Sequence, residues 1–328
     1  MDHSKFPKVE LHLHLDCSLS YDVVKQIDPA ITYEEFRESF VAPPKCTDLA
    51  DYLIRAIKGF ELMQTKEQLR IVTLDLFNQL KSDNVIYAEM RFAPLQHLQK
   101  GLTPVEVVEI VNEAVTDGIQ QTGIEAGIIL CTLRHYSEEQ SMTTVNLVDQ
   151  FRGTNVIGFD IAADEAGFPV THHIKAFEFA KAHAIHCTAH AGEAKGPDSV
   201  RETLQHFHPS RIGHGVRSVE DKELLEFLKK ENIHLEVCPT SNIQTNIYDK
   251  IEDHTADKIY KAGVSMSINT DCRTISDVTL TDEYRTLEKI FNWTKKHYLK
   301  CNLEAIEHSF TTEEKKQKLK EKILAGFS

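Results

Sequence analysis

The sequence predicts an α/β protein in which eight parallel strands close into a (β/α)8 (TIM) barrel. Short apolar segments alternate with longer amphipathic ones along the chain, which is typical of βαβ units. There are eight such apolar segments, and 328 residues suit one closed barrel better than the alternative, an open doubly wound sheet. No GxGxxG or GxxxxGKS/T motif follows an early strand, which weakens the case for a dinucleotide or P-loop fold.

The expected strands run over residues 9–13, 85–91, 126–132, 156–161, 186–190, 211–213, 234–237 and 264–269. Amphipathic helices are expected over residues 66–81, 105–121, 172–183 and 221–231, and Asp198 and Ser218 are expected helix N-caps. The segment 18–83 is too long for one barrel connection, so we expect a helical insertion that covers the site. Further helices are expected near the C-terminus, and residues 1–328 are expected to form a single domain.

Composition and charge indicate an enzyme that acts on a small molecule. The formal net charge is −13, from 37 Lys and Arg against 50 Asp and Glu, and no dense basic run is present. Binding to nucleic acid or to an anionic membrane is therefore not expected. No apolar run approaches ~20 residues, so no membrane span is expected. Seven cysteines without a CxxC pair predict reduced thiols and a cytoplasmic location. The oligomeric state stays open.

Unusual polar residues follow the strands of the expected barrel, at the end where barrel enzymes place their active sites. His12 and His14 end the first strand, and residues two apart share a face, so both are expected to point toward one metal. Alone, this pair could equally be two polar residues at a strand end. With His190, His214 and Asp271 at three further strand ends it indicates a metal site. Three imidazoles and a carboxylate, with one position left for water, suit catalytic zinc.

Glu193 lies three residues beyond His190. It could be a general acid or a carboxylate in the first turn of a helix. Its position next to the expected metal site favours the acid.

Six motifs together resemble the adenosine deaminase family of the amidohydrolase superfamily, in its bacterial form. They are His-Leu-His-Leu-Asp (12–16), Asp-Ile-Ala-Ala-Asp-Glu (160–165), His-Ala-Gly-Glu (190–193), Arg-Ile-Gly-His-Gly (211–215), Cys-Pro-Thr-Ser-Asn (238–242) and Asn-Thr-Asp (269–271). They occur in the order of the family and span most of the chain.

The resemblance implies a barrel with one Zn2+ per chain, held by the metal ligands His12, His14, His190 and Asp271. It implies that Glu193 protonates purine N1 and that His214 orients the attacking water and helps to deprotonate it. Asp16 would bind the ribose 5′-hydroxyl, and His14, Ala163 and Cys272 are further expected substrate contacts. The implied reaction converts adenosine and 2′-deoxyadenosine to inosine and 2′-deoxyinosine plus ammonia, a step of purine salvage.

The implied mechanism is physically coherent. Zinc lowers the pKa of its bound water from about 15.7 toward ~7, and the resulting hydroxide adds to C6. Protonation of N1 by Glu193 neutralises the charge that develops on the ring, which requires a raised pKa for this acid. His214 and Asp271 are each candidates for the base. Cobalt or iron could also occupy such a site, since selectivity depends on metal supply as well.

Two related metal-site patterns do not fit. Cytidine-type deaminases use HxE with PCxxC, whereas Cys238-Pro239 has the reverse order and lacks the second cysteine. Binuclear amidohydrolases generally carry a metal-bridging lysine at the fourth strand, and residues 156–165 contain none. One metal is therefore expected.

Three positions depart from the best-known family members. Cys272 replaces an aspartate that contacts purine N7, and a thiol is a weaker hydrogen-bond partner. Arg273 or Ser276 could assist there. Ala163 replaces a glycine whose amide faces purine N3, and Cys17 replaces a glycine after Asp16. These changes put the exact substrate in question more than the reaction.

Two further features could belong to the site. Phe60, Leu62 and Met63 lie in the insertion and are candidates for an apolar lid, although ordinary helix packing explains them equally well. His135 follows the third strand and could also face the site.

Two alternatives to adenosine deamination remain. One is deamination of another aminopurine, adenine or 6-aminodeoxyfutalosine. The other is a catalytically silent barrel that binds a metal or a ligand. The presence of every expected metal ligand, the acid and the base argues against the silent barrel.

Overall fold

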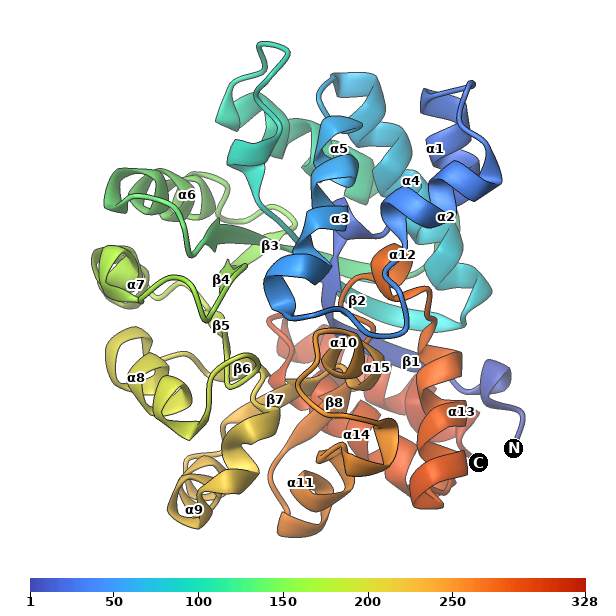
Figure 1. Ribbon diagram of the computed structural model, residues 1–328, viewed down its shortest axis with the longest axis vertical. Helices are drawn as coiled ribbons and strands as arrows, with labels where there is room; N and C mark the ends of the chain where they lie inside the picture. Colours follow the sequence, from blue (N-terminus) through green and yellow to red (C-terminus); the bar gives the residue numbers. More distant parts are fainter.

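Eight parallel strands lie at the centre of the computed structural model, which describes residues 1–328, and helices surround them (Figure 1). The strands are β1 (Lys8–His14), β2 (Val85–Phe92), β3 (Glu125–Leu133), β4 (Val156–Ala162), β5 (Thr188–Ala191), β6 (Arg211–His214), β7 (His234–Val237) and β8 (Met266–Ile268).

The strands form a closed barrel. Hydrogen-bonded neighbours run in the orders β1-β2-β3-β4 and β5-β6-β7-β8. Parallel bridges at Phe159–Cys187 and at Leu13–Asp271 join the two runs. At the second seam, the His14 amide donates to the Asp271 carbonyl at 2.8 Å, and the Asp271 amide donates to the His12 carbonyl at 3.0 Å. The predicted (β/α)8 barrel is confirmed, and the open sheet is wrong.

One helix follows each of the first seven strands in the outer ring. These helices are α4 (Lys66–Ser82), α5 (Pro104–Thr122), α6 (Glu138–Gln150), α7 (Ile174–Ala182), α8 (Pro197–Phe207), α9 (Lys222–Lys230) and α11 (Ala256–Ala262). The start of α5 follows from its sequence, because Thr103 and Glu106 form a capping box and Pro104 takes the first helical position.

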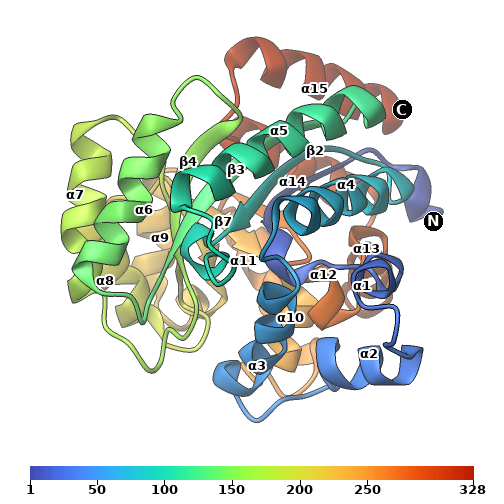
Figure 2. The same ribbon diagram turned by 90° about the horizontal axis from the view of Figure 1, so that it is seen from above.

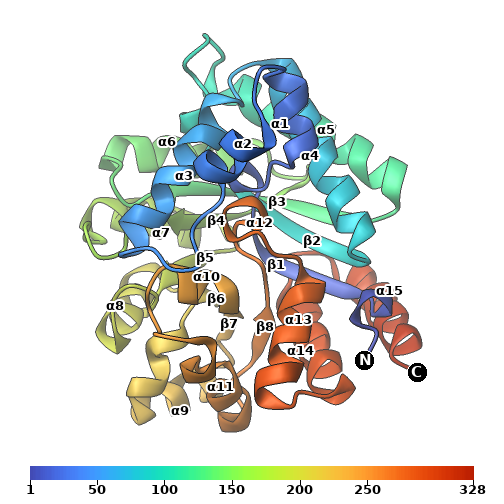
Figure 3. The same ribbon diagram turned by 45° about the vertical axis from the view of Figure 1, so that its right-hand side comes forward.

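Eight further helices complete the fold, and among them α14 (Lys295–His308) packs against β8 and β1 as part of the outer ring. They are α1 (Tyr21–Ile27), α2 (Tyr33–Phe40), α3 (Leu49–Glu61), α10 (Pro239–Gln244), α12 (Arg273–Ser276), α13 (Leu280–Phe291), α14 (Lys295–His308) and α15 (Glu313–Gly326). Figure 2 shows α2 and α3 at one end of the molecule and α15 at the other. The two termini lie close together in Figure 3. The rings of Phe6 and Phe327 stack with their centroids 4.6 Å apart.

Several expected boundaries differ from the structure. β5 begins at Thr188 because Cys187 makes only an isolated bridge, and β8 covers three residues of the expected 264–269. Neither expected N-cap is correct. Pro197 opens α8 and leaves Gly196 at the cap position, so Asp198 lies in the first turn. Ser218 lies in a 3-10 turn, and Asp221 caps α9 by accepting from the Leu224 amide.

Charged side chains fill the centre of the barrel. Arg91 pairs with Asp160 at 2.8 Å and with Glu236 at 2.7 Å, and Arg211 pairs with Glu89 at 2.6 Å and with Glu236 at 2.7 Å. All five side chains are fully buried. Buried charges are tolerated when each is paired, and pairing fixes their positions. This network of buried ion pairs lies inside the barrel, beneath the end that carries the histidines.

No helix in the structure is both long and apolar enough to cross a membrane. All seven cysteines are buried and free of disulfide bonds.

Candidate active site

A cluster of histidines and one aspartate lies at the carboxyl ends of the strands. His12, His190, His214 and Asp271 are buried, and each offers a metal-ligating atom within 4.8 Å of the others. His14 joins them, with its Nε2 at 3.2 Å from His190 Nε2 and 3.3 Å from Asp271 Oδ1. The structure therefore brings together all four predicted metal ligands and the predicted base.

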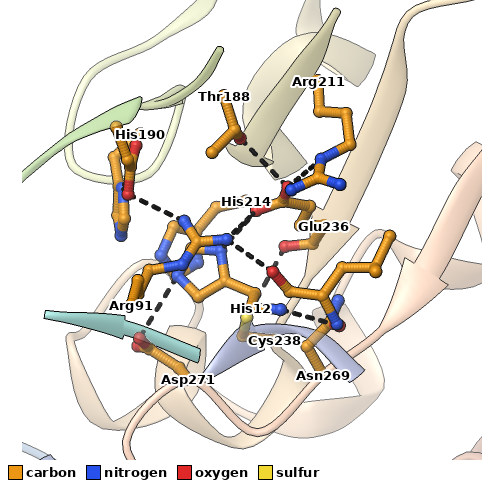
Figure 4. Close-up of polar contacts among 12 residues, drawn as sticks. His12, Arg91, Thr188, His190, Arg211, His214, Glu236, Cys238, Asn269 and Asp271 are labelled. Carbon is orange, nitrogen blue, oxygen red and sulfur yellow. Dashed lines mark hydrogen bonds and ion pairs between the residues drawn. The ribbon is translucent and has the colours of Figure 1, made fainter. Parts of the chain in front are cut away.

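Carboxylates beneath the rings orient two of the histidines. His12 Nδ1 lies 2.9 Å from Glu236 Oε2 (Figure 4). His190 Nδ1 lies 3.1 Å from Asp160 Oδ2. A carboxylate accepts the Nδ1 proton, so the lone pair of each Nε2 faces the cluster. His12 Nε2 is buried without a hydrogen-bond partner. An unpartnered lone pair among three other donors fits a metal ion.

Two of these residues lie in strained backbone. His214 has φ = 62° and Asp271 has φ = 64°. A non-glycine residue there costs on the order of 1–3 kcal/mol and persists only where the surrounding structure holds it. The seam between β8 and β1 supplies this support for Asp271. This backbone conformation places both side chains in the cluster.

The short helix α10 also contacts the cluster. Ser241 Oγ donates to Asp271 Oδ2 at 2.7 Å, and Asn242 Nδ2 lies 3.1 Å from His214 Nδ1. The sequence motif containing Ser241 and Asn242 was identified, but the resemblance gave neither residue a role. Their position just after β7, at the same end of the barrel as the histidines, was the available signal.

Glu193 is the predicted acid, and it lies beside the cluster. Its Oε2 is 3.6 Å from His214 Nε2, and its Oε1 is buried without a hydrogen-bond partner. Burial, followed by the nearby charges of Asp271 and Glu165, raises the pKa of Glu193 well above its usual value. This shift favours the protonated form of the carboxyl group, which is the form a general acid needs.

The loop that carries Glu193 is fixed by a second carboxylate. Glu165 accepts from the backbone amides of Gly192 at 2.7 Å, Glu193 at 3.0 Å and Lys195 at 2.9 Å. Such a cradle holds the acid in one position. Glu165 ends the Asp-Ile-Ala-Ala-Asp-Glu motif and had no predicted role.

A cavity of about 290 Å³ opens onto the cluster. The predicted substrate contacts His14, Asp16, Ala163 and Cys272 all line it, and so does Cys17. The other lining residues are Leu49, Ala50, Tyr52, Leu53, Ile54, Ala56, Ile57, Phe60, Ala93, Cys131, Leu133, His135, Ala162, Asp164, His190, Glu193, His214 and Asp271.

The structure separates the residues considered for the cavity wall. Phe60 lines the cavity with other apolar residues of α3, whereas Leu62 and Met63 pack into the main core. The lid expectation is therefore wrong for Leu62 and Met63. His135 does face the cavity, at its mouth.

Arg273 and Ser276 do not reach the cavity. Arg273 is buried and pairs with Glu10 at 3.0 Å and with Asp83 at 2.8 Å. Ser276 Oγ lies 2.7 Å from the Tyr52 hydroxyl. Arg273 is held by partners outside the cavity, and Ser276 is held by Tyr52 of the cavity wall, so neither side chain lines the cavity beside Cys272.

A closed (β/α)8 barrel with a metal-ligating cluster and a buried carboxyl group beside it, at the carboxyl ends of its strands, is typical of metal-dependent barrel hydrolases. The adenosine deaminase family model matches residues 7–325. An adenosine deaminase from Clostridium acetobutylicum is 36% identical over 324 residues, which cover 97% of each chain. One from Enterococcus faecalis is 35% identical and covers 97% of this chain and 96% of its own. The chain therefore belongs to the adenosine deaminase family.

Solved structures share the fold. An adenine deaminase from Arthrobacter aurescens matches with a TM-score of 0.89 at 24% identity and covers 98% of both chains. An amidohydrolase from Burkholderia ambifaria, solved with bound zinc, matches with a TM-score of 0.90 at 21% identity, over 99% of this chain and 91% of that one. At these identities the likeness concerns the barrel alone.

Proposed function

We propose that this protein hydrolytically deaminates adenosine and 2′-deoxyadenosine to inosine and 2′-deoxyinosine, releasing ammonia. One observation carries the proposal: Glu193, a buried carboxyl group whose pKa is raised, lines the same cavity as the metal-ligating cluster. Removal of an amino group from an aminopurine needs both an acid for the ring and a site that activates water.

The cluster fits one metal ion, and we propose that this ion is Zn2+. His12, His14, His190 and Asp271 would hold it, because three imidazoles and one carboxylate form a donor set that zinc accepts. When bound, the ion would supply a water molecule whose pKa is lowered toward neutrality.

The residues of the chain then have separate tasks. Glu193 donates its proton to N1 of the purine, which neutralises the negative charge that builds up on the ring as oxygen adds to C6. Either His214 or Asp271 takes the proton that the attacking water loses. As the tetrahedral carbon collapses, the proton taken from water passes to the amino group, which leaves as ammonia. The C6 hydroxyl proton restores Glu193, and the 6-oxo purine remains.

The cavity suits an uncharged purine nucleoside. Its lining includes Asp16 and Asp164 but no lysine or arginine, so nothing there pairs with a phosphate. Asp16 would accept a hydrogen bond from the ribose 5′-hydroxyl. Ala163, Cys272 and His14 would contact the purine base. Deamination of adenine or of 6-aminodeoxyfutalosine is the second candidate, because Cys272 and Ala163 depart from the usual family residues.

Adenosine turnover, followed by the fall in ultraviolet absorbance, tests the proposal. Activity in the wild type and its loss in Glu193→Gln would support it. A substrate panel with measured kcat/KM separates the candidates: activity only on adenine or 6-aminodeoxyfutalosine rejects adenosine. A protein that binds one metal but converts no aminopurine would be the silent barrel. Metal analysis should find one zinc per chain, and two would contradict the site.

We also propose that the chain works as one domain in the cytoplasm, without nucleic-acid or membrane partners. Seven free, buried thiols support a reducing compartment. Fractionation of cells that express the protein tests the location.

A further inference from the structure

The proposed reaction leaves one question open, namely whether His214 or Asp271 takes the proton from water. A neutral histidine can accept a proton at Nε2 only if that nitrogen carries no hydrogen. The group that faces Nδ1 decides which nitrogen carries it. The contacts of His214 at Nδ1 therefore determine whether its Nε2 can accept or donate a proton in the cavity.

A backbone amide provides the starting point. The Ala256 N–H donates to His254 Nδ1 at 3.1 Å. A backbone amide can only donate, so this nitrogen of His254 is an acceptor and carries no hydrogen. His254 is buried, and burial lowers its pKa to about 3, so the ring is neutral. Its single N–H is consequently at Nε2.

The next contact fixes the side-chain amide of Asn242. His254 Nε2 lies 3.2 Å from Asn242 Oδ1, which can only accept. The amide nitrogen of Asn242 then faces His214, with Nδ2 at 3.1 Å from Nδ1. Because Nδ2 can only donate, Nδ1 of His214 is an acceptor, and neutral His214 carries its hydrogen at Nε2.

The other two oriented rings of the cluster have the opposite arrangement. Nδ1 of His12 faces Glu236, and Nδ1 of His190 faces Asp160. These carboxylates place hydrogen on Nδ1 and leave Nε2 free for a metal. His214 presents an N–H to the same cluster instead. The contacts at its Nδ1 therefore distinguish His214 from the metal ligands, although one of its ring nitrogens lies within 4.8 Å of a ligand atom of His12, His190 and Asp271.

We infer that Asn242 and His254 are positioning residues that hold His214 as its Nε2–H tautomer. His214 then donates a hydrogen bond to the attacking oxygen, and Asp271 accepts the proton. The water O–H bond breaks, its proton moves to a carboxylate oxygen of Asp271, and the oxygen electron pair forms the new bond to C6. The C6–N1 π electrons move to N1, which takes the proton of Glu193. Ser241 holds Asp271 for this task through the 2.7 Å bond to Oδ2. This assignment rests on the proposed deamination, whereas the tautomer itself does not.

Nitrogen-15 NMR of the full-length, zinc-loaded protein labelled at histidine tests the tautomer directly. Two-bond proton–nitrogen correlations distinguish Nε2–H from Nδ1–H rings, and the His214 signals are those that disappear in His214→Gln. We expect Nε2–H for both His214 and His254. A hydrogen on Nδ1 of His214 overturns the inference.

Substitution of Asn242 tests the cause. In Asn242→Asp the side chain accepts on both sides, so His214 should change to Nδ1–H. We expect kcat for adenosine to fall roughly 10²-fold, as when one preorganised donor is lost, with KM little changed. An unchanged tautomer in this variant overturns the role of Asn242. If the variant does not fold, the wild-type spectrum alone decides.

Two further variants are controls. His254→Gln keeps a donor toward Asn242 and should keep the His214 tautomer. Asn232→Asp makes the same chemical change at an exposed position and should alter neither the spectrum nor kcat. Failure of this inference is distinguishable from failure of the proposed function. If His214 carries Nε2–H but the protein is inactive on aminopurines, only the proposed function is rejected. If the protein is active but His214 carries Nδ1–H, only the positioning role of Asn242 and His254 is rejected.

Discussion

Ala163 holds a methyl group in a backbone conformation that favours glycine. Its φ is 78°, and it lines the cavity at the end of β4. The left-handed conformation costs an L-residue about 1–2 kcal/mol, because its Cβ crowds the following carbonyl. Asp160, two residues inside the strand, is fixed by Arg91 and His190 and keeps the chain on this path. The strained position therefore belongs to the wall that would face the purine.

Ala163→Gly should raise stability. Relief of the strain outweighs the greater freedom of glycine in the unfolded chain, which costs about 0.4–1 kcal/mol. We expect a net gain in the free energy of unfolding of about 1 kcal/mol or less, measured by urea denaturation. Ala162→Gly is the matched control, since Ala162 is outside the positive-φ region and should lose stability. Equal losses in both variants would contradict the strain.

Glu283 is a buried carboxylic acid outside the cavity. Its Oε1 accepts from the Thr240 amide at 2.9 Å at the start of α10, and its Oε2 has no partner. Burial raises its pKa from 4.5 to about 8. The folded protein therefore holds this proton more tightly than the unfolded chain. The contribution to stability is full below about pH 4.5 and is lost as pH rises toward about 8.

Glu283→Gln should remove the loss of stability that wild type shows as pH rises toward about 8. Glutamine keeps the acceptor for Thr240 and cannot ionise. The difference in unfolding free energy between the variant and wild type should therefore grow by about 1.4 kcal/mol for each pH unit between about pH 5 and about pH 8. The Tm of the variant should rise relative to wild type over the same range. Thermal unfolding at both pH values measures it, with exposed Glu226→Gln as control. A difference independent of pH would be inconsistent with a buried acid that ionises.

Helix α3 forms the apolar wall of the cavity, and one glycine sets its distance from the barrel. Gly59 lies against the 3-10 turn that follows β1, and a Cβ built on it would overlap the carbonyl oxygen of Asp16. Leu53, Ile54, Ile57 and Phe60 of the same helix line the cavity. The close approach of Gly59 thus links Asp16, the proposed ribose-binding residue, to the wall.

Gly59→Ala should push α3 outward. We expect a loss of about 1–3 kcal/mol of stability from overpacking, and a rise in KM for adenosine with a smaller change in kcat. Steady-state kinetics and urea denaturation measure both. Lys58→Ala, at the exposed neighbouring position, should leave KM unchanged. A kcat loss at constant KM would mean that α3 acts on the chemistry rather than on binding.

Elements with a strong local pattern were predictable, and elements fixed by distant contacts were not. The strands that carry His12, His190 and His214 have short apolar sequences, and their polar ends follow the rule for barrels. α10 has six residues, too few for a periodic pattern. The cap of α9 was misplaced because Asp221 and Ser218 are both good cap residues and only the structure distinguishes them.

At the scale of the whole molecule, the unpredicted residues share one property. Glu236 lies 224 residues from His12 along the chain, and Asp160 lies 30 residues from His190. No local pattern reports such contacts. His12 and His14 could be predicted because residues two apart in a strand share a face. The carboxylate partners of the histidines can be identified only in the closed barrel.

Closure of the barrel gives the metal a structural role. β1 supplies His12 and His14, and Asp271 follows β8 across the second seam. This seam and the seam between β4 and β5 each have a single bridge, whereas the other neighbouring strands pair over several residues. A metal bound by both sides would cross-link the barrel at one of its two least paired positions.

Removal of the metal should therefore weaken this seam first. At free zinc a thousandfold above its Kd, binding stabilises the folded state by about 4 kcal/mol, so chelation should lower Tm. Hydrogen exchange should accelerate most at the His14 and Asp271 amides, which span the seam. Amides between β2 and β3 should be protected equally with and without metal below the transition, because six residue pairs join those strands. Acceleration spread evenly over all eight strands would mean that the metal stabilises the fold globally and does not hold the seam.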